Sequence, residues 1–178
     1  MNDYKLVFTG TMGAGKTTAI AAISDVLAVN TDVENTDASL DKPLTTVGLD
    51  YGLLNLDSGD RVRLFGTPGQ ARFDFMWKIL VKDAFGLIVL VDNSRPAPLD
   101  DLNDYLHGFA STLSEIPCVI GVGRMESHPM PTMDHYAEHL AKHDLALPIL
   151  RVDVRKRDEV IGLVELILAQ GEAIDVYV

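Results

Sequence analysis

Residues 10–17 have the types and spacing of a loop that binds phosphate groups. They match the pattern G-x-x-x-x-G-K-[ST] and read Gly10-Thr11-Met12-Gly13-Ala14-Gly15-Lys16-Thr17. Glycines let the backbone curl so that successive N–H groups point at phosphate oxygens, and a helix starting near Lys16 adds its positive dipole end. Lys16 is expected to bridge the terminal phosphates and the Thr17 hydroxyl to bind Mg²⁺. The pattern therefore predicts that this loop, with the adjacent Thr18, binds a triphosphate.

The segments around this loop alternate between strands and helices. Strand-like runs are predicted at residues 4–9, 46–56, 61–65, 86–92, 118–122 and 148–152, and helical patterns at residues 16–29, 71–83, 99–115, 133–143 and 158–169. Only the turn at residues 57–60 is short enough to force a hairpin, so one strand is expected to be antiparallel. The prediction is an α/β fold with three layers and a mostly parallel six-stranded sheet containing one antiparallel strand.

Ligands of such sheets bind beyond the carboxyl ends of the strands. The loops that matter are therefore expected at residues 10–16, 66–70, 92–96, 123–126 and 153–155. Residues 30–45 form a long polar connection, and connections of that length are usually functional or mobile.

Composition and charge restrict the class of partner. The chain has 178 residues, 47% of them hydrophobic, and a formal net charge of −11. An acidic surface repels nucleic acid and anionic lipid, so neither is expected as a partner. The single cysteine, Cys118, excludes an intrachain disulfide and agrees with a reducing compartment. No secretory leader is recognised, and no apolar run is long enough for a membrane span. A cytoplasmic protein without direct membrane insertion is expected.

A second loop, residues 66–70, adds a resemblance to a known family. Together with the phosphate loop and residues 45–52, it makes the chain resemble the Ras superfamily of small GTPases. More narrowly, the chain resembles the bacterial branch that includes the gliding-motility polarity GTPase and related predicted cytosolic GTPases. The most specific stretch is Phe65-Gly66-Thr67-Pro68-Gly69-Gln70-Ala71-Arg72-Phe73. The resemblance implies a single small G domain over residues 1–178, with GTP/GDP and Mg²⁺ as ligands.

The resemblance also implies roles in the two switch segments. Thr46 matches the threonine that binds Mg²⁺ and senses the γ-phosphate, although Thr45 is a neighbour that could take the role. The alternative is that both are β-branched residues at the start of a strand. Gly69 matches the glycine whose N–H meets the γ-phosphate, and Gln70 matches the residue that orients the attacking water. Gln70 and Lys16 are thus the expected catalytic residues.

The second switch departs from the superfamily pattern at Gly66. The superfamily has an aspartate there, which holds Mg²⁺ through water, and the bacterial branch shares the departure. We hypothesise that Asp50 supplies the missing carboxylate, so that Thr17, Thr46 and Asp50 form the metal site. The alternative is a solvent-facing aspartate on an edge strand.

The segment that reads the base also departs from the superfamily. Where Asn-Lys-x-Asp is usual, this chain has Gly123-Arg124-Met125-Glu126. Glu126 keeps a carboxylate on a longer stem, and Arg124 is expected to lay its aliphatic stem along the base. Asp153 falls where the last base-binding loop is expected. A carboxylate facing the base favours guanine, but adenine use or lax specificity stays open.

Two smaller patterns have structural alternatives. His135, His139 and His143 recur at helical spacing, and a solvated helix face is favoured over a metal site. The candidates for an arginine that meets the γ-phosphate are Arg61, Arg63 and Arg72.

The function expected from these residues is a nucleotide-dependent molecular switch that binds GTP/GDP with Mg²⁺ and hydrolyses GTP slowly. A protein activator, by resemblance a roadblock-type dimer, and an effector are the expected partners. Two alternatives remain. One is a degenerate scaffold that binds nucleotide without turnover, and the other is an ATP-using P-loop enzyme.

Overall fold

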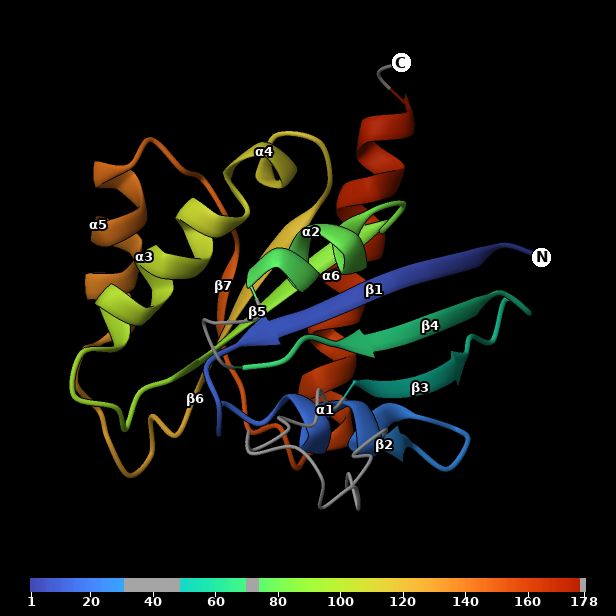
Figure 1. The fold of residues 1–178 in the computed structure, drawn as a ribbon, viewed down its shortest axis with the longest axis horizontal. Coiled ribbons are helices and arrows are strands. Elements are labelled where there is room, and N and C mark those ends of the chain that lie inside the picture. Colours follow the sequence, from blue (N-terminus) through green and yellow to red (C-terminus); the bar gives the residue numbers. More distant parts are fainter. Residues whose placement is uncertain (31–48, 70–73, 177–178) are drawn as a thin grey trace, which may run out of the picture.

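The structure is a computed structural model that describes residues 1–30, 49–69 and 74–176 (Figure 1). Its strands are β1 (Asp3–Gly10), β2 (Val29–Asn30), β3 (Asp50–Asn55), β4 (Arg61–Gly66), β5 (Gly86–Asp92), β6 (Cys118–Gly123) and β7 (Ile149–Arg151). Its helices are α1 (Lys16–Ile23), α2 (Asp74–Val81), α3 (Pro98–Gly108), α4 (Ala110–Leu113), α5 (Met133–Lys142) and α6 (Arg157–Val176).

The strands form one sheet in the order β2-β3-β4-β1-β5-β6-β7. β3 is antiparallel to both of its neighbours, whereas β4, β1, β5, β6 and β7 pair in parallel. The predicted α/β fold with a mostly parallel sheet and one antiparallel strand is therefore confirmed. The strand that sequence patterns did not predict is β2, which has 2 residues at the sheet edge.

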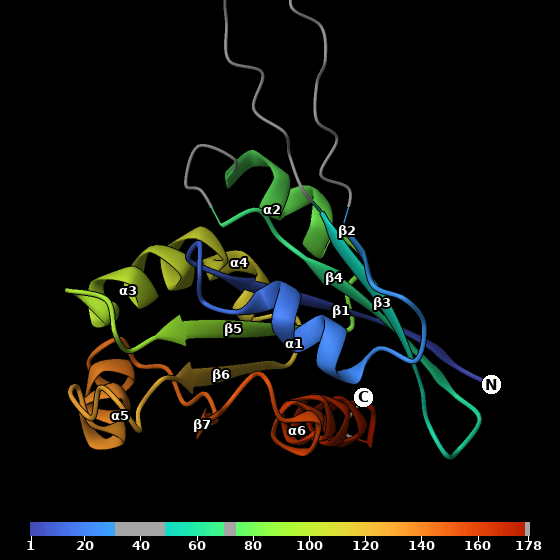
Figure 2. The ribbon, with the colours of Figure 1, turned by 90° about the horizontal axis from the view of Figure 1, so that it is seen from below.

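Helices cover both faces of the sheet, so the domain has three layers. Figure 2 shows α2 and α3 on one side and α6 on the other. Alternate residues of the central strands serve the two faces. Leu6 and Phe8 of β1 pack with α1 and α6, while Val7 between them packs with α2 and α3. All 7 residues of β5 are buried, as expected for a strand covered on both faces.

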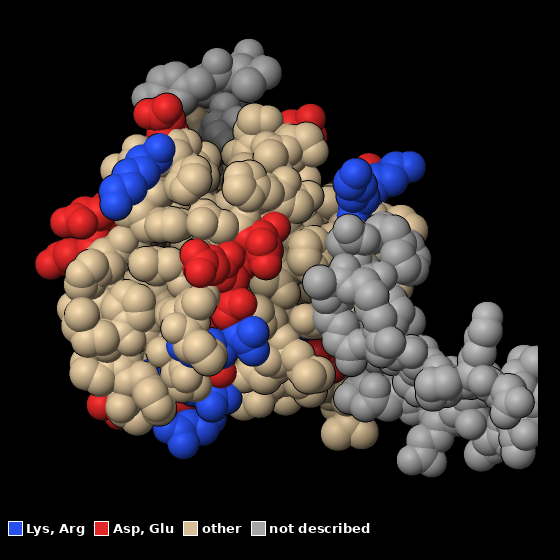
Figure 3. Space-filling view, turned by 60° about the vertical axis from the view of Figure 1, so that its left-hand side comes forward, with Lys and Arg blue, Asp and Glu red and all other residues tan. Residues whose placement is uncertain are grey.

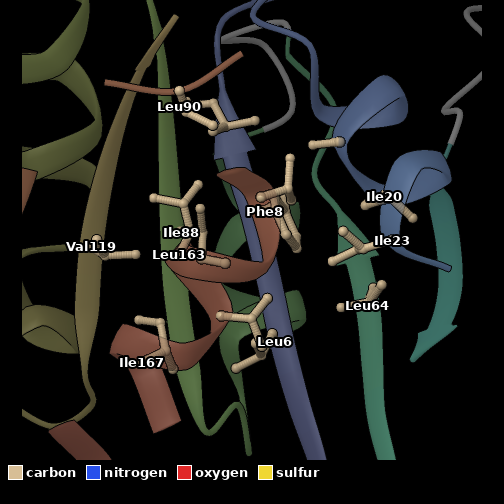
Figure 4. Packing of buried hydrophobic residues seen from close by; sticks show 14 of the residues in the cluster. Leu6, Phe8, Ile20, Ile23, Leu64, Ile88, Leu90, Val119, Leu163 and Ile167 are labelled. Atoms are coloured by element: carbon tan, nitrogen blue, oxygen red, sulfur yellow. The ribbon is translucent and has the colours of Figure 1, made fainter. Parts of the chain in front are cut away.

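The hydrophobic core on the α6 side of the sheet joins α6 to α1, the helix that follows the phosphate loop. Figure 4 shows Leu163 and Ile167 of α6 near β5, and Ile20 and Ile23 of α1 on the other side of β1, with Leu6 and Phe8 between them. All four side chains are fully buried in one cluster. This packing fixes the axis of α1, and hence the direction of the loop that precedes it.

Helix α1 is shorter than the sequence pattern predicts. The pattern favours residues 16–29, but the helix ends at Ile23. The Arg157 guanidinium from α6 donates to the carbonyl of Ile23 at 2.8 Å and to Asp25 at 3.0 Å. The Ser24 hydroxyl accepts the N–H of Leu53 at 3.1 Å. These tertiary contacts satisfy the last helical groups and turn the chain toward β3, which local periodicity does not reveal.

Two further helices differ from their predicted bounds because of aromatic packing. The pattern over residues 99–115 is broken into α3 and α4 at Phe109, which is 1% exposed and has a φ of −108°. Trp77 stacks on Phe109 with ring centroids 5.3 Å apart, which anchors the break. In contrast, α6 runs to Val176, past the predicted end at residue 169. Gly171 in this extension lies against the Phe85 ring, where a Cβ would come within 2.1 Å of a ring atom.

Acidic side chains are exposed on the surface, in agreement with the net charge of −11. Figure 3 shows acidic side chains gathered near the centre of one face, next to a smaller basic group. Within the part of the chain that the structure describes, no helix has both the length and the apolar character needed to cross a lipid bilayer.

The burial of Cys118 gives a direct test of the sheet. Its side chain is 1% exposed, and burial raises the pKa of the thiol to about 12. The thiol is then neutral and shielded at pH 8, so we expect no reaction of the native protein with iodoacetamide and full reaction in denaturant. Because the thiol ionises near 9 when unfolded, its contribution to stability is complete below that pH and is lost as pH rises toward 12. Rapid native labelling, followed by mass spectrometry, would contradict this placement of β6.

Candidate nucleotide-binding site

A pocket of about 930 Å³ opens at the carboxyl ends of the parallel strands. The five loops that sequence analysis selected all contribute to it, which agrees with the rule for ligand sites in such sheets. Gly10 and Thr11 are not among the lining residues, but their carbonyl oxygens accept hydrogen bonds from Lys16. The lining comprises Asp50, Asp92, Glu159 and the four segments at residues 12–18, 67–69, 123–127 and 151–155.

The phosphate loop depends on glycine at two close approaches. Gly15 immediately precedes α1 and has a φ of 97°, and a Cβ there would lie 2.7 Å from the Val154 side chain. Gly10 has a φ of 144°, and a Cβ there would overlap the carbonyl oxygen of Leu90. At both positions the φ is in the left-handed region and a Cβ would meet a neighbouring atom. Backbone strain and steric overlap therefore both exclude a larger residue. The loop therefore wraps tightly over the end of β5 before entering α1.

Lys16 is held at the centre of this loop. Its side chain is buried, and its ammonium donates to the carbonyl oxygens of Gly10 at 2.7 Å and Thr11 at 2.9 Å. Burial lowers the pKa of Lys16 to about 8, and the charge of Asp50 opposes that shift. An anion in the pocket would favour the charged ammonium, because it would replace the solvation that burial removes.

Asp50 lies beside the Thr17 hydroxyl, which donates to its Oδ2 at 2.7 Å. The carboxylate is 9% exposed, so the solvent-facing alternative is wrong for this residue. Asp50 pairs with Gly66 across β3 and β4. A Cβ on Gly66 would lie 2.9 Å from Asp50 Oδ2. The carboxylate of Asp50 thus occupies the space toward which a side chain at position 66 would point.

Residues 67–69, at the start of the predicted second switch, pack on the loop of residues 10–17. A Cβ on Gly69 would lie 2.5 Å from Met12 N and 2.8 Å from Lys16 Nζ, so only glycine fits there without movement. The buried hydroxyls of Thr67 and Thr9 share a hydrogen bond of 2.8 Å. Further along, the indole N–H of Trp77 donates to the carbonyl of Pro68 at 3.3 Å. These contacts connect the segment both to β1 and to α2.

Several predicted residues lie outside the described ranges. They are Thr45 and Thr46 in the first switch and Gln70 and Arg72 in the second. Their roles stay predictions. Of the other arginine candidates, Arg61 and Arg63 form ion pairs with Asp3 at 3.4 Å and 2.8 Å and do not line the pocket.

At the other end of the pocket, Arg124 bridges two loops. Its Nε lies 3.3 Å from Asp92 Oδ1, and its guanidinium donates to the carbonyl of Gly13 at 3.0 Å. The residue has a φ of 63°, a conformation that costs a non-glycine residue roughly 1–2 kcal/mol. The two contacts hold it there, and strain of this kind is common where a side chain is positioned for function.

The predicted base-binding carboxylate has a partner that sequence analysis missed. Glu126 is 72% exposed and forms an ion pair of 2.9 Å with Arg151, at the end of β7. Asp153 binds the guanidinium of Arg155 at 2.7 Å, and these hydrogen bonds lower the pKa of its carboxyl. The N–H of Asp153 donates to Glu159 at 2.6 Å. No local pattern marks Arg151, whereas Asp92 could have been suspected from its place at the end of a buried strand.

The three histidines at helical spacing have different contacts; His135 and His139 lie on α5, and His143 follows it. His135 caps the helix through Thr132, while His139 bonds Asn103 of α3 at 2.7 Å. His143 is exposed and lies 5.1 Å from the His139 ring. Across residues 1–30, 49–69 and 74–176, no group of three or more His, Cys, Asp or Glu side chains is placed to hold a metal.

The fold and the pocket define an α/β protein of the P-loop type, and comparison of the sequence with known families agrees. The chain belongs to the family described as "conserved hypothetical ATP binding protein", whose model matches residues 31–170. That match begins after the phosphate loop, so the motif at residues 10–17 is separate support for the class.

Individual relatives include Ras-related proteins. Uncharacterized protein MJ1339 of Methanocaldococcus jannaschii is 32% identical over 56% of this chain and 58% of that protein. Ras-related protein Rab-32 of Sus scrofa is 29% identical over 66% of this chain and 51% of that protein. Ras-related protein Rab-12 of Homo sapiens is 26% identical over 68% and 47%. The chain thus spans about half the length of these relatives. Together they support a place in the P-loop, Ras-like superfamily, and the narrower bacterial branch stays a prediction.

The contact between Asp50 and Gly66 predicts a coupled pair of substitutions. Gly66→Asp should lower the free energy of unfolding by about 1–3 kcal/mol, because its side chain meets the Asp50 carboxylate. Asp50→Gly should remove that conflict. The double variant should therefore lose less free energy of unfolding than the sum of the losses in the two single variants. Denaturant midpoints of the four proteins measure the coupling. Purely additive effects would contradict the proximity of the two positions.

Proposed function

We propose that this protein is a nucleotide-dependent molecular switch that binds GTP/GDP with Mg²⁺ and hydrolyses GTP slowly. The observation that carries the proposal is the hydrogen bond of 2.7 Å from Thr17 to the buried Asp50, beside the Lys16 ammonium. A phosphate-binding cation and a hydroxyl–carboxylate pair for a metal are the two parts that such a site needs. We further propose that residues 1–178 form a single small G domain.

The phosphates would be bound by the main chain of residues 10–18 and by Lys16. The ammonium already rests on two carbonyl oxygens, so its position is set before a ligand arrives. Pre-organisation of this kind favours tight binding, because little side-chain freedom is lost when the phosphate enters. Gly69 lies against the same loop and would place its N–H near the γ-phosphate.

The residues available for Mg²⁺ fit that ion. Mg²⁺ prefers six oxygen ligands, keeps several waters, and is usually held by one or two protein groups together with substrate phosphates. Thr17 and Asp50 supply a hydroxyl and a carboxylate 2.7 Å apart, and Thr46 would add a second hydroxyl. When bound, Mg²⁺ would neutralise charge on the β- and γ-phosphates.

Hydrolysis would depend on Gln70, which would orient the attacking water, while Lys16 would stabilise charge on the transferred group. Turnover would be slow without help, as the resemblance to small GTPases implies. Of the candidate arginines, Arg61 and Arg63 pair with Asp3 outside the pocket, and Arg72 lies outside the described residues. An activator protein would then accelerate turnover. The resemblance to the bacterial branch favours a roadblock-type dimer in that role, and loss of the γ-phosphate would release both switches from an effector.

The base would lie between Arg124 and the loop at Asp153, with Glu126 reading its edge. A carboxylate accepts hydrogen bonds from two donors of guanine, and adenine offers no matching pair. The second candidate function is ATP binding, which the family description favours. The ion pair of Glu126 with Arg151 also leaves that carboxylate less free for guanine. A scaffold without turnover is favoured only by the glycines at positions 66 and 123.

Titration of nucleotide-stripped protein with GTP, GDP and ATP tests the ligand and the metal. Trp77, the only tryptophan, is bonded to Pro68, so its fluorescence should report the binding. We expect tighter binding of GTP than of ATP and weaker binding in EDTA. Lys16→Ala should lose about 30-fold or more of the affinity, since it removes a buried charged partner. Asp50→Asn should reduce the difference between the affinities in Mg²⁺ and in EDTA, because it removes the carboxylate from the proposed metal site.

Equal or preferred binding of ATP would replace the GTPase proposal with an ATP-using enzyme. A Mg²⁺ dependence in Asp50→Asn equal to that of the wild type would exclude Asp50 from the metal site while leaving nucleotide binding intact.

Phosphate release separates a switch from a scaffold. In Gln70→Leu we expect the single-turnover rate of GTP hydrolysis to fall by about tenfold or more, with unchanged GTP affinity, because the side chain acts only on the attacking water. Arg63→Ala serves as the control, since that residue lies outside the pocket. Wild-type protein that binds GTP but releases no phosphate over many hours would support the scaffold instead.

A further inference from the structure

The loop that would read the base, residues 124–131, follows Gly123, which has no side chain that could hold the start of the loop in place. Gly123 ends β6, and nothing lies closer than 3.6 Å to a Cβ built on it. A larger residue would therefore fit sterically at this position. The loop nevertheless has a defined course, with the N–H of His128 donating to the carbonyl of Arg124 at 2.9 Å.

Asn93, the residue after β5, supplies that anchor from the neighbouring strand. Its side chain is 2% exposed. The amide Nδ2 donates to the carbonyl of His128 at 2.6 Å and to the carbonyl of Pro131 at 3.0 Å. Its main-chain N–H donates to the carbonyl of Gly123 at 3.2 Å. One buried residue thus holds the loop at its start, its middle and its end.

Tyr136 of α5 fixes the orientation of this amide. Its hydroxyl donates to Asn93 Oδ1 at 2.6 Å, and the tyrosine is fully buried. With the oxygen engaged by a donor, the amide nitrogen must face the two carbonyls, so rotation of the amide would break all three bonds. Every polar atom of the Asn93 side chain has a partner, which makes the arrangement specific as well as stable.

Neighbouring contacts show what the anchor controls. Arg124 and Glu126 lie between the points that Asn93 holds, Gly123 and His128. Arg124 reaches Asp92, the residue before Asn93, through an ion pair of 3.3 Å. Figure 1 shows the loop after β5 and the loop after β6 beside each other at the lower edge of the sheet. The end of β5 therefore positions both residues expected to face the base.

We propose that Asn93, oriented by Tyr136, is the positioning residue for base recognition in this protein. The inference rests on the proposed function, since it assumes that the pocket binds a nucleoside triphosphate. Asn93 contacts neither base nor phosphate; it holds the 124–131 loop so that Arg124 and Glu126 meet the base. Its loss should affect discrimination between bases and leave phosphate binding alone.

The test compares a ligand with a base to one without. Affinities for GTP, ATP and inorganic tripolyphosphate are measured by calorimetry on wild type, Asn93→Ala and Tyr136→Phe, each shown to be folded by its melting temperature. We expect GTP affinity to fall about tenfold in Asn93→Ala and less in Tyr136→Phe. The GTP/ATP ratio should move toward one, and tripolyphosphate affinity should stay constant. Asn103→Ala is the matched control, because that asparagine bonds His139 of α5 and not the loop.

The outcomes separate this inference from the proposed function. Equal losses for GTP and tripolyphosphate, or an unchanged GTP/ATP ratio in folded variants, would overturn the role of Asn93 alone. If Asn93→Ala does not fold, Tyr136→Phe decides by the same ratio, since it removes one hydroxyl only. Wild type that binds tripolyphosphate as tightly as GTP would overturn base recognition itself, and the inference with it.

Discussion

The buried carboxylate of Asp50 is the constraint on which the phosphate end of this structure depends. A buried charge needs hydrogen bonds or an opposite charge, and Asp50 has the Thr17 hydroxyl and the nearby Lys16 ammonium. Because β3 is antiparallel to β4, the same strand pairing sets Asp50 opposite Gly66. The register of β3 on β4 therefore places the Asp50 carboxylate in the space that a side chain at position 66 would occupy.

The two ends of the pocket are built by different means. At the phosphate end, the main chain of β1 and α1 forms the cradle, and α6 holds α1 in place through buried contacts. At the end where the base is proposed to bind, the side chains of Asn93 and Asp92 hold the loop that follows β6. A single side-chain substitution should therefore alter the base end more readily than the phosphate end.

Sequence reasoning predicted the parts that depend on local pattern. The phosphate motif and the alternation of strands and helices follow from spacing and periodicity. The place of Asp50 beside Thr17 is a hypothesis from the family resemblance, and the structure brings the two side chains together. Sequence reasoning could not predict the end of α1, which Arg157 sets from across the fold. Nor could it find Asn93, whose three partners lie 35 to 43 positions away along the chain. Contacts of that range appear only once the sheet order is known.

Under the proposed function, the exposure of Glu126 and Arg151 would limit how well the pocket distinguishes one base from another. Glu126 is 72% exposed and Arg151 is 58% exposed, so their ion pair is well screened by water and adds little to stability. A base that enters beside them would exclude part of that water and strengthen every hydrogen bond it makes. The Arg151 guanidinium and the hydrogen-bond donors of the base would then compete for the Glu126 carboxylate. Strong discrimination requires that the loop hold Glu126 at the base edge, and the hydrogen bonds that fix the loop come from the buried end of β5.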